Sequence, residues 1–188
     1  MTNELLWYVS RATGVASLAL LTAVVVLGVV TSGRRRPHGE SATVVMGLHR
    51  WLSLGMTAFL LGHIATAIGE TYVSIDLVSA VLPFTSGYER LWVGLGTVAF
   101  DLLAAVVVSS VLRHRLRPAV WKAIHGFSYA MWPIAVVHGF ALGTSAEPLL
   151  RWVTVVCGAV GVGAIAWRVT STHADREARR AADQLAWS

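Results

Sequence analysis

Residues 47–63 read GLHRWLSLGMTAFLLGH, and residues 121–139 read WKAIHGFSYAMWPIAVVHG. Both stretches are apolar, and each carries two histidines, His49 and His63 in the first and His125 and His138 in the second. The spacing is 14 residues in the first stretch and 13 in the second. A helix rises about 1.5 Å per residue, so each pair would span about 20 Å of a hydrocarbon core about 30 Å thick. The two histidines of each stretch are therefore expected near opposite faces of a membrane.

The composition indicates an integral membrane protein with little soluble mass. Of the 188 residues 55% are hydrophobic and only 13% are charged, and the mean hydropathy is +0.63. A soluble domain carries about twice that share of charge. The single cysteine, Cys157, lies in an apolar run, which excludes a disulfide framework, a thiolate metal site and a redox dithiol. The pI of about 10.1 could suggest nucleic acid, but the positions of the charges indicate membrane topology instead.

Five apolar runs are each near the roughly 20 residues that a spanning helix needs. They cover about 12–30, 44–68, 91–112, 119–142 and 150–168. The sequence thus predicts an all-α membrane domain over residues 1–170, built as a five-helix bundle, followed by a short polar cytoplasmic tail over 171–188. Residues 73–82 are predicted to form a short interfacial helix in the longest loop.

The basic residues predict the orientation of the bundle. Twelve of the fifteen Lys and Arg residues flank one side of the predicted spans, among them Arg34, Arg35 and Arg36. The other side has Arg11, Arg90 and Arg151. The positive-inside rule then places the N-terminus outside and the C-terminus in the cytoplasm, with a bacterial cytoplasmic membrane as the expected location.

With this topology the second and fourth spans run in the same direction. His49 is then level with His125 near the inner face, and His63 is level with His138 near the outer face. A lone buried histidine is more often a hydrogen-bonded structural residue, but four at matching heights predict the axial ligands of two stacked b-type haems. The iron of each haem would be bound by one imidazole from each span.

Other residues are predicted to serve the same site. Arg11, Arg50 and Lys122 are candidates to contact the haem propionates, with Arg90 and Arg151 as further candidates that topology explains equally well. Glycines beside the ligands, Gly47, Gly62, Gly126 and Gly139, would admit a flat macrocycle or simply allow close helix packing. On a straight helix the 13-residue spacing would leave His138 about 140° from His125. Pro133 therefore predicts a distortion near Trp132–Pro133 that turns His138 back toward its partner.

Each of three side chains in the apolar regions, Asp101, Trp132 and Phe59, allows two interpretations. Asp101 is either a proton-relay group or a protonated structural acid, and the second is favoured. Trp132 and Phe59 lie at heights between the two haems and either line an electron route or pack in the core. His38, His114 and His173 lie among arginines in polar segments and are predicted to be solvated.

The chain resembles the ferric-reductase-like transmembrane domain family, which is shared with NADPH oxidases. The resemblance is carried by His49-Arg-Trp-Leu with Gly62-His63, and by Trp121-Lys-Ala-Ile-His125-Gly with Val137-His138. Weaker parts are Arg11-Ala-Thr-Gly14, Pro83-Phe84 and Leu95-Gly96-Thr97. It covers about residues 5–170. The resemblance implies two b haems on these four histidines and electron flow from the cytoplasmic side outward.

Larger members of that family carry a flavin and nicotinamide domain, and after Thr170 only eighteen residues remain here. A separate flavoprotein or a membrane quinol is therefore the expected electron donor, with no flavin or nicotinamide site in this chain. The resemblance implies an oxidoreductase membrane subunit whose acceptor is ferric iron, oxygen or a partner reductase or flavoprotein. The alternatives are a quinol-linked cytochrome b subunit, a non-redox protein whose histidines carry protons or a metal ion, and an assembly subunit that binds haem only to dock a partner.

Overall fold

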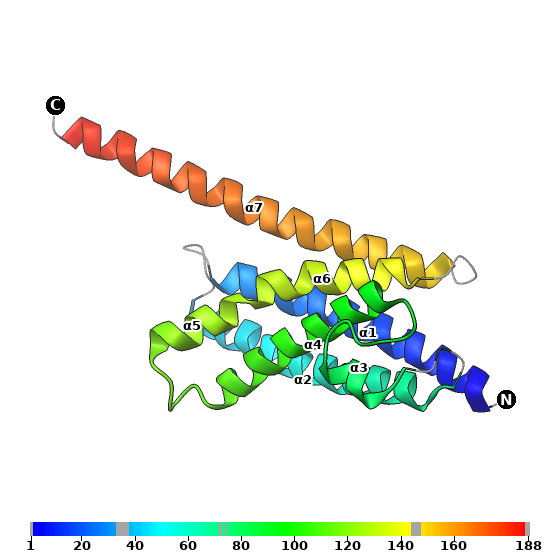
Figure 1. Ribbon diagram of the computed structural model, residues 1–188. Coiled ribbons are helices and arrows are strands. Elements are labelled where there is room, and N and C mark those ends of the chain that lie inside the picture. The colour runs from blue at the N-terminus through cyan, green and yellow to red at the C-terminus, as the bar shows by residue number, and fades with distance from the viewer. Residues whose placement is uncertain (1, 33–37, 72, 74, 144–147, 187–188) are drawn as a thin grey trace.

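A computed structural model describes residues 2–32, 38–71, 73, 75–143 and 148–186. The described chain is helical and contains no strand. The helices are α1 (Thr2–Thr31), α2 (Glu40–Gly69), α3 (Leu77–Val81), α4 (Arg90–Val111), α5 (Pro118–Gly126), α6 (Ser128–Ala141) and α7 (Pro148–Ala186). Figure 1 shows the long helices running roughly alongside one another, with the C-terminal part of α7 projecting beyond the bundle. Arg34, Arg35 and Arg36, on which the topology prediction partly depends, lie outside the described residues.

Within the described residues four helices are long and apolar enough to cross a membrane, so the chain is an integral membrane protein. The spans are Asn3–Thr31, Glu40–Gly69, Arg90–Val111 and Pro148–Thr170. The fifth predicted span, about 119–142, is divided into α5 and α6, neither of which is long enough alone. In the described tail, α7 continues without interruption from the last span to Ala186.

Helix α1 is the centre of the bundle. It packs against α2, α6 and α7, and of the four spans it has the largest buried share. Apolar side chains of α1 form the core together with residues from α2, α4, α6 and α7: Leu18, Leu21, Val25, Val29, Met56, Ala99, Leu103, Met131, Trp132 and Cys157. In a membrane no hydrophobic force drives helices together, so they associate through dispersion contacts and close packing at small residues.

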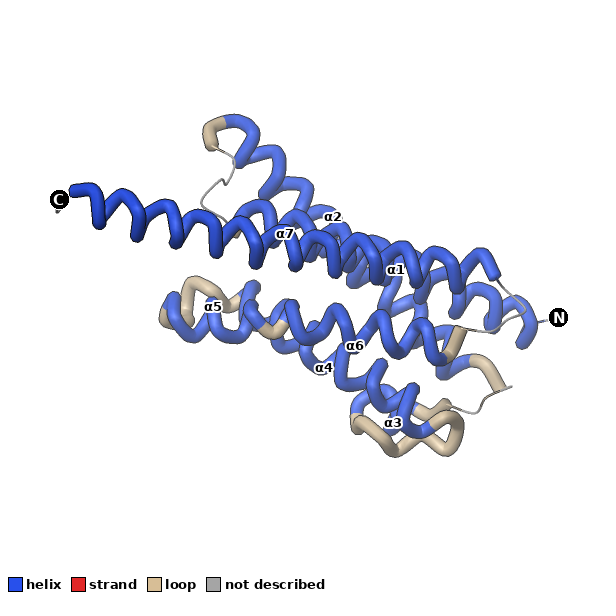
Figure 2. The backbone as a smooth tube through the Cα atoms, turned by 90° about the horizontal axis from the view of Figure 1, so that it is seen from above, coloured by secondary structure: helices blue, strands red, loops and turns tan. Residues whose placement is uncertain are grey.

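Helix α2 stands apart from the helices that carry the other two histidines. Within the described chain its Cα atoms approach only α1 and α3 to within 8 Å, and none approaches α4, α5 or α6 so closely. Its span is also the least buried of the four. In Figure 2, α5 and α6 lie on the opposite side of the bundle from the first half of α2. Helix α2 is therefore joined to the rest of the described bundle mainly through α1.

The segment that carries His125 and His138 is interrupted at a place that the sequence did not predict. The interruption lies at Phe127, whose N–H bonds the Ile124 carbonyl at 3.0 Å, and α6 then continues across Pro133. The distortion expected at Trp132–Pro133 stays a prediction. Gly126, which ends α5, is a poor helix former, and this favours an interruption at that point.

The loop after α2 folds back onto α4 through α3. The Asp76 side chain caps α3 by accepting a hydrogen bond from the Ser79 N–H at 2.8 Å. The Thr97 hydroxyl of α4 donates to the Ser79 carbonyl at 2.7 Å. The short helix predicted within residues 73–82 is thus present as the five residues of α3, and it closes one end of the bundle between α2 and α4.

Candidate functional site: two facing histidine pairs

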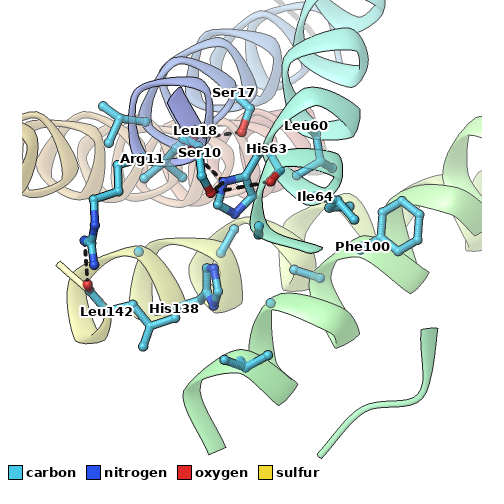
Figure 3. A pocket seen from close by; sticks show the side chains of 18 of the residues that line it. Ser10, Arg11, Ser17, Leu18, Leu60, His63, Ile64, Phe100, His138 and Leu142 are labelled. Carbon is cyan, nitrogen blue, oxygen red and sulfur yellow. Dashed lines mark hydrogen bonds between the residues drawn. The ribbon is translucent and has the colours of Figure 1, made fainter. Parts of the chain in front are cut away.

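The rings of His63 on α2 and His138 on α6 face each other across a cavity. Their centroids are 6.4 Å apart and their planes are inclined at 78°. Figure 3 shows the two imidazoles pointing toward one another from opposite walls. The cavity has a volume of about 240 Å³, and apolar side chains such as Leu18, Leu60 and Leu103 provide most of its lining. The site thus pairs two nitrogen donors within an apolar enclosure.

The second pair repeats this arrangement about 20 Å farther along α2. The centroids of His49 and His125 are also 6.4 Å apart, with the planes inclined at 50°. Trp121 stacks on His125, with ring centroids 5.2 Å apart and planes inclined at 30°. The rings therefore lie opposite each other in the combination expected from the sequence, and their role as haem ligands stays a prediction.

Backbone carbonyls fix the tautomers of His63 and His138. Nδ1 of His63 lies 2.7 Å from the carbonyl oxygen of Ser10 on α1, and Nδ1 of His138 lies 2.8 Å from that of Trp92 on α4. A carbonyl oxygen can only accept, so each Nδ1 carries the proton and donates. Each Nε2 then keeps its lone pair, which is the state that ligates a metal.

The His49–His125 pair is held less firmly. Nδ1 of His49 and Nδ1 of His125 are both buried, and neither makes a hydrogen bond. The backbone of Val24 lies near the His49 ring. Val24 is 14 residues after Ser10, just as His49 is 14 residues before His63, so antiparallel α1 places a residue beside each ring of α2, although only the Ser10 carbonyl forms a hydrogen bond with its ring.

Three glycines that the sequence analysis did not connect with the ligands lie against the rings. A methyl group at Gly14 would lie 2.9 Å from Nδ1 of His63, and one at Gly96 would lie 2.5 Å from Cε1 of His138. At Gly28 it would lie 3.7 Å from Cε1 of His49, an ordinary contact. Gly14 and Gly28 share the 14-residue spacing of the histidines, and this pattern was a usable signal.

The four glycines predicted to admit a macrocycle or to allow close helix packing differ in what lies next to them. Gly62 faces Thr13, and Gly139 faces Leu18 and Thr154, so both serve helix packing. Gly47 and Gly126 face open space, and a methyl group added to either would have nothing within 4 Å. The macrocycle interpretation of those two stays a prediction.

The separation of the rings suits one metal ion between two imidazoles. A metal–imidazole bond is about 2.0–2.1 Å, and the ring nitrogen lies roughly 1.15 Å from the centroid, so centroids about 6.4 Å apart are expected. Both pairs have this separation. Among the described residues no third His, Cys, Asp or Glu joins either pair. Two trans imidazoles are the donor set that suits an iron whose other four ligands come from a porphyrin, so the residues fit haem.

The predicted propionate contacts differ in their positions. Arg11 lines the cavity, donates to the Leu142 carbonyl at 2.9 Å (Figure 3) and lies over the Trp7 ring at 4.3 Å. Arg151 also lines the cavity and lies 4.6 Å from the Phe140 centroid. Arg50 and Lys122 are exposed beside His49 and His125. The roles of these cations toward propionates stay predictions.

Trp132 packs in the core. Its indole N–H donates to the Thr22 hydroxyl at 3.0 Å, its ring lies against Gly161 of α7, and it does not line the cavity. Phe59 is 45% exposed on α2. The packing interpretation is therefore favoured for Trp132. Asp101 is half-buried on α4, and the described residues give it no hydrogen bond.

Glu70, at the end of α2, is an acid of the cavity that the sequence analysis did not single out. It lines the cavity and is only 4% exposed. Burial raises the pKa of the Glu70 carboxyl above its ordinary value, while the positive charge of Arg11 partly opposes that rise. An acidic residue directly after a long apolar run was the available signal.

No curated protein and no solved structure matches this chain. One family model, described as ferric reductase like transmembrane component, matches residues 13–136. The match contains His49, His63 and His125, and His138 lies two residues beyond it. The matched segment is well over half of the 188 residues and holds helix α2, with His49 and His63, and the glycines that lie against the rings. The resemblance predicted from the sequence is confirmed, and the chain belongs to the family of ferric reductase like transmembrane components.

Proposed function

We propose that this protein is a di-haem membrane cytochrome b that carries electrons across the bilayer. Membership of the family indicates a redox role in a membrane. The proposal of two haems rests on the equal 6.4 Å separation of the ring centroids in both histidine pairs. Each pair has one ring from α2 and one from α5 or α6. A b-type haem held by two imidazoles accepts and releases single electrons.

Each part of the chain has a place in this proposal. His49 and His125 hold the inner haem, and His63 and His138 hold the outer one. The Ser10 and Trp92 carbonyls keep the outer imidazoles in the ligating tautomer. Arg11 and Arg151 neutralise propionates of the outer haem, and Arg50 and Lys122 those of the inner one. Helices α5 and α6 together form the fifth crossing, with the N-terminus outside and residues 171–188 as the cytoplasmic tail.

The donor is a separate flavoprotein or a membrane quinol, and the acceptor is extracytoplasmic. The acceptor classes are ferric iron, oxygen and a partner reductase or flavoprotein. The second candidate, transport of a proton or a metal ion by the same histidines, is less well supported. Zinc sites in proteins have three or four protein ligands, and the described residues offer only pairs.

Electron transfer across vesicles tests the proposal. Purified protein carrying both haems is reconstituted into vesicles that contain ferricyanide, and dithionite is added outside. Wild-type protein should reduce the enclosed ferricyanide, and His49→Ala should abolish this because it removes one ligand of the inner haem. His114→Ala, which changes an exposed loop histidine, is the matched control and should transfer electrons normally. Wild-type protein with two haems that leaves the ferricyanide oxidised would contradict the proposal.

A further inference from the structure

Glu70 lies two helical turns beyond His63, about 10 Å along α2 on the side away from His49. Its side chain is 4% exposed, and its buried Oε1 atom makes no hydrogen bond. Its backbone N–H is satisfied by the Thr66 carbonyl at 3.0 Å, so the unsatisfied atom is Oε1 of the carboxyl. A buried polar atom without a partner costs free energy and calls for an explanation.

Helix capping does not explain a carboxyl at this position. Glu70 is the C-terminal cap residue of α2, where the helix dipole disfavours a negative charge. It donates to and accepts from no described side chain. A glutamine or an apolar residue would end the helix equally well. The position is therefore better explained by the chemistry of the cavity that Glu70 lines.

The charged and titratable groups around that end of the cavity come from every neighbouring element. Arg11 extends from α1, Arg151 from α7 and Tyr88 from the segment before α4. His63 and His138 come from α2 and α6, and α3 contributes the hydroxyl of Ser79. Tyr88 lines the cavity and is itself 37% exposed, so part of the cavity wall lies at the protein surface. A proton from water would enter beside this part of the wall.

We propose that Glu70 takes up one proton when the cofactor held by His63 and His138 gains one electron. The inference rests on the proposed function. The electron comes from the inner haem, which a quinol or a reduced flavoprotein supplies. The proton comes from extracytoplasmic water, and the carboxylate becomes a carboxylic acid. One negative and one positive charge enter together, so the net charge of the enclosed site is unchanged.

Electrostatics gives the direction of this coupling. An added electron near a carboxylate raises its proton affinity, because like charges disfavour the ionised form. The interaction is strong in an apolar enclosure, where the effective dielectric constant is low. Burial already raises the pKa of the Glu70 carboxyl, so an added electron would act in the same direction.

The measurable consequence is a pH-dependent midpoint potential of the outer haem. Glu70 then has one pKa when the outer haem is oxidised and a higher pKa when it is reduced. At pH values below both, Glu70 is protonated in either redox state, and at pH values above both it is ionised in either. The potential is therefore independent of pH in those two ranges. Between them the potential should fall by up to about 59 mV per pH unit, the one-electron equivalent of a tenfold change in proton concentration.

Potentiometric titrations of detergent-purified protein test this between about pH 5 and pH 9, around the raised pKa of a buried carboxyl. In Glu70→Gln the pH dependence of one of the two haems should vanish. Its potential should stay near the low-pH limit of wild type, because glutamine resembles the neutral acid. Glu89→Gln changes an exposed carboxyl before α4 and should keep the wild-type slope. A wild-type potential that does not vary with pH, or an unchanged slope in Glu70→Gln, would overturn the proposal.

A second measurement needs no variant. Wild-type protein in weak buffer with a pH indicator is reduced stepwise, and about one proton per chain should be taken up within the sloping range. No uptake would overturn the inference. Protein that binds no haem would instead refute the proposed function, so the two failures are distinguishable.

Discussion

The ring of His138 lies directly against the backbone of Gly96: a methyl group on Gly96 would be 2.5 Å from Cε1 and 2.6 Å from Nδ1 of the histidine. The same Nδ1 donates to the carbonyl of Trp92 at 2.8 Å. Residues 92 and 96 are one turn apart on α4, so one helical turn supplies both the space and the hydrogen bond that orient the ring.

Gly96→Ala should therefore weaken cofactor binding at the His63–His138 pair. The added methyl forces the imidazole away from its Trp92 hydrogen bond, and loss of such an outer-shell contact typically costs about 10- to 100-fold in metal affinity. Haem content after purification should fall from about two toward one per chain. Gly87→Ala, at a glycine with nothing within 4 Å, is the control and should retain both haems. Full haem content in Gly96→Ala would show that the ring has more freedom than its contacts indicate.

Gly14 and Gly28 provide an internal comparison, because they occupy equivalent places on α1. Gly14→Ala places a methyl group 2.9 Å from Nδ1 of His63, whereas Gly28→Ala places one 3.7 Å from Cε1 of His49. The first should reduce occupancy of the His63–His138 site, and the second should be nearly silent. Haem absorbance per chain checks both, and equal behaviour of the two variants would contradict the geometry.

The large features of the fold were predictable because they depend on composition and spacing. Apolar run lengths gave four of the five predicted spans, and the matching histidine intervals gave the pairing that the ring separations support. Gly14, Gly28 and Gly96 were not connected with the ligands, because a glycine's role depends on which ring packs on it, and that requires the register of two helices. The hydrogen bonds to the Ser10 and Trp92 carbonyls involve the backbone, so the identity of these two residues does not reveal them.

The helix break at Phe127 shows a different limit. Pro133 is the stronger sequence signal, since proline removes a backbone donor, yet α6 tolerates it. The break lies after Gly126, where helix propensity is low on its own. Breaking the helix at either point could redirect His138, so the sequence predicted the need for a distortion without determining its place.

Gly161→Ala should destabilise the bundle through Trp132. A methyl group there would overlap Cζ2 of the indole, which is held in place by its bond to Thr22. Overpacking of this kind typically costs about 1–3 kcal/mol. Thermal unfolding in detergent should occur at a lower temperature than in wild type. Gly163→Ala, which faces open space two residues away, should unfold like wild type, and equal stability of the two variants would contradict the packing.

Removal of the cofactors should loosen α2 more than any other span. Its described backbone approaches only α1 and α3, and its span is the least buried. Ligands that bind only the folded state stabilise it by mass action. Hydrogen exchange of protein produced under haem limitation should show faster exchange in α2 than in α1, relative to haem-loaded protein. A uniform change across the spans would mean that the cofactors do not join α2 to α5 and α6.

A reduced-minus-oxidised absorption spectrum, with haem quantified per chain, tests the central claim most directly. The account predicts about two low-spin b-type haems in wild-type protein, and one or none after His63→Ala or His125→Ala. His38→Ala, which changes an exposed histidine, should keep both. Protein that is folded, supplied with haem during expression and still colourless would contradict the account, and the paired histidines would then have to serve proton or metal transport.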